Sequence, residues 1–184
     1  YTKAYLETAN YLKWFMKNQT DYGNCEYKNQ LFLPMCYLYR NCVELSLKTI
    51  WFEETGEDFQ VKCKLMMDKK HSIEGMWKQL KPYVLEYSKG TAEPEYIDVI
   101  EDYCIQVQKL DSDANKFRYP MANTMQVYFS QNKRFDFIHI GDFFEALNNI
   151  LDGIDSEFSY VNEIKAEMEA EYYAEMMAEQ EYYW

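Results

Sequence analysis

Three charged residues at helical spacing inside an apolar stretch are the feature that most constrains the fold of this chain. The segment 31–52 is rich in Leu, Met, Phe, Tyr, Cys and Trp, which predicts a helix that is buried nearly all round. Arg40, Glu44 and Lys48 recur within it at i, i+4 and i+8 and therefore share one face. Because a buried charge is costly unless it is paired, hydrogen-bonded or used, this row predicts a polar site inside a helical bundle.

The composition excludes several classes of protein. A chain of 184 residues suffices for one domain with a sizeable core. Its net charge of −12 disfavours non-specific binding of nucleic acid, although Arg40, Lys48 and Arg118 can still create a local basic cleft. The sequence contains no run of about 18 uninterrupted apolar residues, so we expect no membrane span. It contains no basic segment in front of an apolar one, so we expect no leader peptide.

Cysteine usage bears on metals, cofactors and compartment. The five cysteines form no CxxC pair and no Cys/His cluster, so we expect no metal site and a reducing, cytoplasmic compartment. We find no Walker loop and no GxGxxG motif, and we therefore expect no cofactor.

Apolar periodicity predicts a mainly all-α fold with helices over about 2–17, from near Pro34 to 54, over 72–90, over 93–110 and from Asp142 to 154. Ser72 is a plausible N-cap of the third helix, and Gly56 marks the end of the second. The alternating residues of 59–67 are compatible with a short strand or an irregular extension. Alternation on both sides of the polar turn 130–133 predicts a small β-hairpin around 124–140.

The segment 156–184 is more acidic than the residues that precede it. It holds eight glutamates and one lysine for a net charge of −7, which leaves −5 for residues 1–155. We therefore divide the chain into a helical domain, 1–155, and an acidic amphipathic helical tail, 156–184. The tail carries an apolar stripe, so it either packs on its own core, pairs with another chain, or covers a basic cleft; the stripe comprises Val161, Ile164, Met168, Tyr172 and Met176.

Three short motifs, in the order in which they follow one another along the chain, resemble those of a branch of the HEPN superfamily. The name of this superfamily refers to higher eukaryotes and prokaryotes nucleotide-binding. Residues 40–48 read Arg-Asn-x-x-Glu-Leu-x-Leu-Lys, residues 71–77 read His-Ser-x-x-x-Met-Trp, and residues 117–120 read Phe-Arg-Tyr-Pro. The resemblance covers roughly residues 5–155 and implies a bundle of four or five helices, frequently dimeric. Many members are metal-independent ribonucleases of toxin–antitoxin, phage-defence and CRISPR-associated systems, and others are non-catalytic partners of nucleotidyltransferases.

Ribonucleases of that superfamily usually carry an arginine, four intervening residues and a histidine, with a polar residue after the arginine. The spacing occurs here as Arg134 to His139, but Phe135 replaces the polar residue. If the segment is a strand, positions five apart face opposite sides, and the two residues cannot act together. If it is instead a loop that enters a helix, that objection does not apply.

The other candidate catalytic residues are Arg40, Glu44 and His71, with Asn41, Lys48, Arg118 and Tyr119 as candidate binding residues. Metal-free cleavage of RNA needs a base, an acid and a cation beside the phosphate. A histidine serves as acid or base near neutral pH, an arginine holds phosphate in bidentate fashion, and a glutamate orients either one. The same row is also compatible with a buried salt-bridge network that only fixes the register of the helix.

Two functions therefore compete. The first is a HEPN-like protein of a bacterial or phage defence or toxin–antitoxin-type system that binds or cleaves RNA, with RNA or a nucleotide as its ligand. The second is a non-catalytic dimerisation or adaptor module that binds a protein partner through its helices and residues 156–184. Both are compatible with a homodimer.

Overall fold

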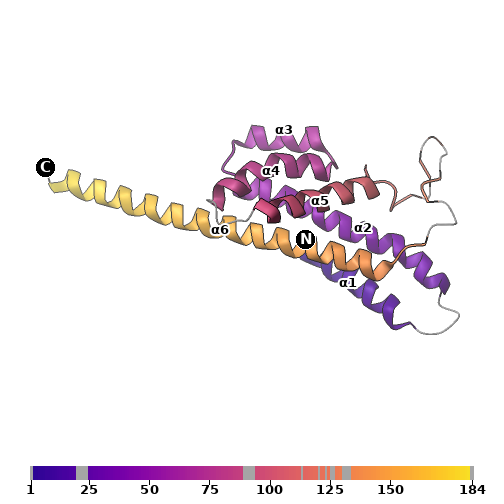
Figure 1. Cartoon of the computed structure of the whole chain (residues 1–184). Helices are drawn as coiled ribbons and strands as arrows, with labels where there is room; N and C mark the ends of the chain where they lie inside the picture. Colours follow the sequence, from indigo (N-terminus) through magenta and orange to yellow (C-terminus); the bar gives the residue numbers. More distant parts are fainter. Residues whose placement is uncertain are drawn as a thin grey trace.

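The chain folds into a bundle of α-helices (Figure 1). The structure is a computed structural model that describes residues 2–19, 25–88, 94–112, 114–119, 121–122, 124, 127–129 and 134–182. Within these residues it contains helices and no β-strand, which confirms the all-α class. The elements are α1 (Thr2–Asn18), α2 (Cys25–Thr49), the π-helical turn η2 (Ile50–Glu54), α3 (Phe59–Lys69), α4 (Ile73–Tyr87), α5 (Pro94–Leu110) and α6 (Phe137–Tyr182).

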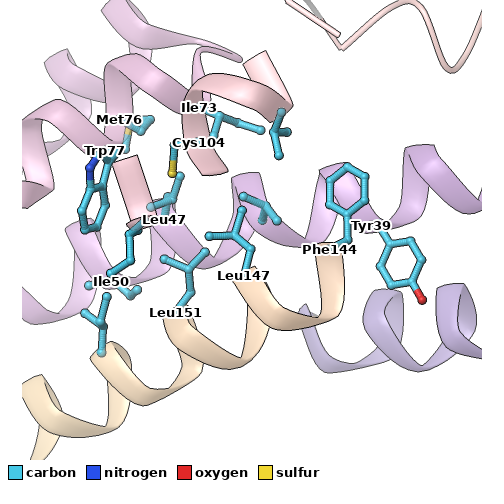
Figure 2. Packing of buried hydrophobic residues seen from close by; sticks show 14 of the residues in the cluster. Tyr39, Leu47, Ile50, Ile73, Met76, Trp77, Cys104, Phe144, Leu147 and Leu151 are labelled. Atoms are coloured by element: carbon cyan, nitrogen blue, oxygen red, sulfur yellow. The ribbon is translucent and has the colours of Figure 1, made fainter. Parts of the chain in front are cut away.

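Helix α2 is the centre of the bundle. It packs along α1 on one side and along the first half of α6 on another, while α4 packs on a third side and α5 packs on α4 (Figure 1). Figure 2 shows the core between these helices. Trp77, Leu47 and Leu147 are fully buried, and the rings of Tyr39 and Phe144 stack 5.5 Å apart and almost parallel. Burial of this apolar surface is the main stabilising contribution.

Several predicted boundaries are confirmed. The first helix and the fourth, now α1 and α5, lie where the periodicity places them. The helix that includes η2 ends at Glu54, and Gly56 follows with φ = 56°, the left-handed conformation that favours glycine. Ser72 caps α4 as predicted, because its Oγ accepts a hydrogen bond from the Gly75 N–H at 3.1 Å.

Two predictions are wrong, one about the start of helix α2 and one about residues 59–67. Helix α2 begins at Cys25, so Pro34 lies inside the helix rather than in its first turn. The side chains of Asn29, Gln30 and Pro34 are exposed, so the first part of α2 lacks the apolar character on which the prediction of this helix was based. Residues 59–67 belong to α3, and neither a strand nor an irregular extension forms there.

The predicted β-hairpin around 124–140 is also not observed. Its turn, 130–133, lies outside the described residues, and its second strand is helical from Phe137 onward. Asp136 explains the difference, because its Oδ1 accepts hydrogen bonds from the N–H groups of Ile138 and His139 at 3.0 and 3.1 Å and so caps α6. One isolated antiparallel bridge joins Met121 and Val127.

Helix α6 therefore begins before Asp142, where we expected the fifth helix to start. Asp142 lies within the helix, and its Oδ1 pairs instead with Lys13 Nζ on α1 at 2.8 Å. The helix then continues without a break through the boundary at 155/156. Phe158, beyond that boundary, is only 1% exposed, so the bundle includes the first part of the acidic segment. The division into two domains stays a prediction.

Candidate functional site

Arg40 is buried at the point where three elements meet. Its side chain is 1% exposed, and each of its three guanidinium nitrogens donates a hydrogen bond within the protein. Nη1 donates to Glu44 Oε2 at 2.7 Å, Nη2 to the carbonyl of His71 at 2.7 Å, and Nε to the carbonyl of Asp111 at 3.1 Å. Arg40 thus ties α2 to the α3–α4 connection and to the end of α5, and it is not available to hold a phosphate.

Glu44 lies one turn further along α2, and its carboxylate contacts the side chains of Arg40, Lys48 and His71. Its Oε2 accepts from Arg40, while Oε1 accepts from Lys48 Nζ at 2.6 Å and lies 2.9 Å from His71 Nδ1. Burial alone would raise the pKa of Glu44, but the hydrogen bonds from Lys48, Arg40 and His71 outweigh it and hold the pKa below its ordinary value. Glu44 is therefore a charged, fully engaged carboxylate.

His71 is the member of the cluster that faces the solvent. Its side chain is 52% exposed, whereas that of Glu44 is 6% exposed. Since the Glu44 carboxylate can only accept, the contact favours a proton on Nδ1 and leaves Nε2 as the acceptor nitrogen of the ring. The backbone around His71 is fixed by the Arg40 bond to its carbonyl and by the Ser72 cap, and the preceding Lys70 has φ = 49°.

Two further residues, not predicted from the sequence, lie at this place: Asp111 belongs to the buried network, and the half-buried Gln108 binds the start of α4. Asp111 is 0% exposed; its Oδ1 accepts from the N–H groups of Asn115 and Lys116, and its Oδ2 lies 3.6 Å from Arg40 Nε. Gln108 Oε1 accepts from the N–H of Ile73 at 2.8 Å at the start of α4. A buried arginine with only one acidic neighbour on its own helix was the signal that another carboxylate should lie nearby.

The remaining candidate binding residues are only partly in this cluster. Lys48 belongs to it, with a side chain that is 22% exposed. Arg118 is in the loop after α5, where its guanidinium lies 5.6 Å from the ring centroids of both Tyr37 and Tyr119. Its Nε donates to the carbonyl of Ala114 at 2.7 Å. Asn41 follows Arg40 on α2 and is half-buried.

Arg134 and His139 occupy a second place, at the beginning of α6. Arg134 is exposed in the segment that leads into the helix and lines a pocket of about 320 Å³ together with Lys28 and Phe32. His139 is in the first turn of α6 with a side chain that is 91% exposed, and its Nδ1 lies 3.7 Å from Asp136 Oδ2. Because this segment is a loop entering a helix, the objection based on a strand does not apply.

The described residues contain no cluster of three or more His, Cys, Asp or Glu side chains arranged to hold a metal ion. None of the helices in this part of the chain combines the length and the apolar character needed to cross a membrane. Comparisons of the chain with protein-family models, with curated proteins and with solved structures find no match.

Proposed function

We propose that the chain is a HEPN-like protein of a bacterial or phage defence or toxin–antitoxin-type system, and that it binds RNA and cleaves it at His71. One observation carries the proposal. A half-exposed imidazole is held at Nδ1 by a buried carboxylate, and a buried arginine holds both that carboxylate and the backbone of the same histidine. A general base needs this kind of fixed orientation to meet its substrate.

The chemistry of the cluster assigns a different role to each residue. His71 Nε2 would take the proton of a ribose 2′-hydroxyl, whose oxygen then attacks the adjacent phosphorus and displaces the 5′-oxygen. The departing 5′-oxygen takes its proton from solvent, to which the site is open. Lys48 would contribute positive charge near the phosphate. Arg40 acts as a positioning residue, because its nitrogens are already engaged by protein acceptors.

The bundle and the distribution of charge support the same proposal. Helices α1, α2, α4 and α5 together with the first half of α6 are compatible with the bundle of four or five helices that the resemblance implies, with α3 as an addition. The acidic end of α6 extends away from the bundle (Figure 1). Solvent screens charges beyond about 10 Å, so those distant glutamates would repel RNA at the bundle only weakly. A homodimer is part of the proposal.

Metal-free cleavage of total RNA in the presence of a chelator tests this function. We would compare the wild type with His71→Ala and His71→Gln, and with His139→Ala as the matched control, since these are the two histidines of the chain. The proposal predicts cleavage that both His71 variants lose and His139→Ala retains. Normal cleavage by a folded His71→Ala variant would overturn it, and so would absence of RNA binding and cleavage by the folded wild type.

The position of Arg134 and His139 favours a second candidate site for the same reaction. Both residues are exposed and lie five positions apart, Arg134 just before α6 and His139 in its first turn, and the resemblance associates this spacing with ribonuclease activity. Cleavage that is lost in His139→Ala and retained in His71→Ala would assign the reaction to this pair. In that case the cluster around Arg40 would be a structural network only.

A further inference from the structure

The C-terminal half of α6 leaves the bundle after a well-defined set of contacts. Phe158 stacks on the ring of Tyr87 at 4.1 Å, Asn162 Nδ2 donates to the carbonyl of Glu54 at 3.0 Å, and the Lys165 ammonium lies 4.4 Å from the Tyr87 ring centroid. Every side chain from 163 to 179 is exposed. Figure 1 shows this part of the helix extending past the other helices. We call residues 163–179 the arm; it is about 25 Å long.

The arm is built from a four-residue repeat. From Glu163 onward the sequence places glutamate first, an apolar residue second and alanine fourth, four times in succession. Since residues four apart lie on neighbouring turns, each position of the repeat forms a row along the helix. The apolar row comprises Ile164, Met168, Tyr172 and Met176, and the glutamate row comprises Glu163, Glu167, Glu171, Glu175 and Glu179.

The side chains of the apolar row are exposed to solvent. Met168 and Tyr172 are 65% and 60% exposed, and Ile164 and Met176 are 37% and 38% exposed. A continuous apolar strip of this length is unusual on the surface of a monomer and commonly marks a binding surface. Beside it, consecutive glutamates of the glutamate row repel one another at i,i+4 spacing, and the arm holds six glutamates and one lysine.

Charge decides what can cover the apolar row. A second copy of the arm would bring two acidic helices together, and an anionic membrane surface would repel the arm in the same way. A left-handed coiled coil also needs apolar residues every 3.5 positions on average, whereas these recur every four. A basic partner would instead relieve the repulsion along the glutamate row while it buries the apolar row.

We propose that the arm is a docking surface for a Lys/Arg-rich amphipathic helix of a protein partner. The apolar side of that helix would cover Met168 and Tyr172, and its cations would pair with Glu167, Glu171 and Glu175. This proposal is independent of any action on RNA, because it uses residues outside the bundle. An adaptor function of the chain would follow from it directly.

Binding of a synthetic peptide to the full chain tests the proposal. The probe is a fluorescent helical peptide with a leucine stripe flanked by lysines, and fluorescence anisotropy measures its affinity. We expect Met168→Ser with Tyr172→Ser to weaken binding at least about tenfold. Replacement of Glu167, Glu171 and Glu175 by Gln should weaken binding and reduce its dependence on salt. The control Ala170→Ser with Ala174→Ser, on the alanine row, should leave the affinity unchanged.

A second peptide separates the contributions of charge and apolar contact. It keeps the leucine stripe and carries glutamates in place of the lysines, and we expect it not to bind. Equal binding of both peptides, or no loss in the Met168/Tyr172 variant, would overturn the proposal. Sedimentation of the chain alone provides a further check, because self-association that the Met168/Tyr172 variant abolishes would make a second copy the occupant.

Discussion

His71 Nδ1 lies 2.9 Å from Glu44 Oε1, a contact that joins two residues 27 positions apart in the chain. Arg40 touches both of them, through the other carboxylate oxygen of Glu44 and through the backbone carbonyl of His71. The exposed imidazole is thus supported by two buried charges of opposite sign. The fold and the candidate site share the same side chains, and substitutions within the cluster are expected to affect both.

Replacement of Arg40 by Ala should lower the free energy of unfolding by about 3 to 5 kcal/mol. The substitution leaves Glu44 without its buried partner, and it removes the donors to the carbonyls of His71 and Asp111. Urea unfolding measures the change. Lys78→Ala is the matched control, since it removes an exposed i,i+4 pair with Glu74 and should change stability little. Equal effects of the two substitutions would contradict the role of Arg40.

The stability of the protein should fall in acid partly because of Glu44. Its pKa in the folded chain lies below the ordinary value of 4.5, so its pairing contributes stability above that pH. That contribution is lost as the pH falls through the lower pKa of the folded state. Unfolding followed across this range should show a shallower acid decline in Glu44→Gln than in the wild type. Asp142→Asn provides the comparison for an exposed carboxylate paired with Lys13.

Asp155→Asn should stabilise the protein at neutral pH by about 0.5 to 1 kcal/mol. Burial raises the pKa of Asp155, and the charges of Glu54, Glu53 and Asp152 raise it further. Its Oδ1 is buried without a hydrogen-bond partner among the described residues. Because the folded state disfavours the charged form, the gain should be present at neutral pH and should disappear in acid, where Asp155 is protonated. Thermal unfolding at both pH values measures it, and a gain that persists in acid would contradict this explanation.

Truncation should distinguish the bundle part of α6 from the arm. A chain that ends at Ala166 keeps Phe158 and Asn162 in place, so its free energy of unfolding should stay within about 0.5 kcal/mol of that of the full chain. A chain that ends at Asp155 loses the buried ring of Phe158 and should be destabilised by about 3 to 5 kcal/mol. Urea unfolding measures both. Similar stability of the two truncated chains would contradict the boundary between bundle and arm.

The sequence predicted what depends on local spacing. The i,i+4 row of Arg40, Glu44 and Lys48 and the cap at Ser72 follow from helical periodicity and backbone chemistry, and the structure contains both sets of contacts. The partner Asp111 could not be located in this way, because 71 residues separate it from Arg40 and only tertiary packing brings them together.

The errors have an equally physical origin. Phenylalanine at 135 and 137 alternates with polar residues as in a strand, but the side chain of Asp136 between them caps a helix. Residues 59–67 also alternate, yet they form a helix that buries none of its residues fully. Periodicity in so short a segment is too weak to separate strand from helix. The apolar stripe of the tail can be read from the sequence. Whether that stripe is buried or exposed depends on tertiary packing, and in the structure Met168 and Tyr172 are exposed.

The tautomer of His71 tests the central claim most directly, namely that Glu44 holds this imidazole in one orientation. Nitrogen NMR of the full chain, at a pH where both rings are neutral, should show two imidazoles, assigned with His139→Ala. We expect a proton on Nδ1 of His71 in the wild type, lost or mixed in Glu44→Ala, which removes the acceptor, while His139 keeps its own tautomer in both proteins. A proton on Nε2 of His71 in the wild type, or a tautomer that a folded Glu44→Ala variant leaves unchanged, would contradict this claim.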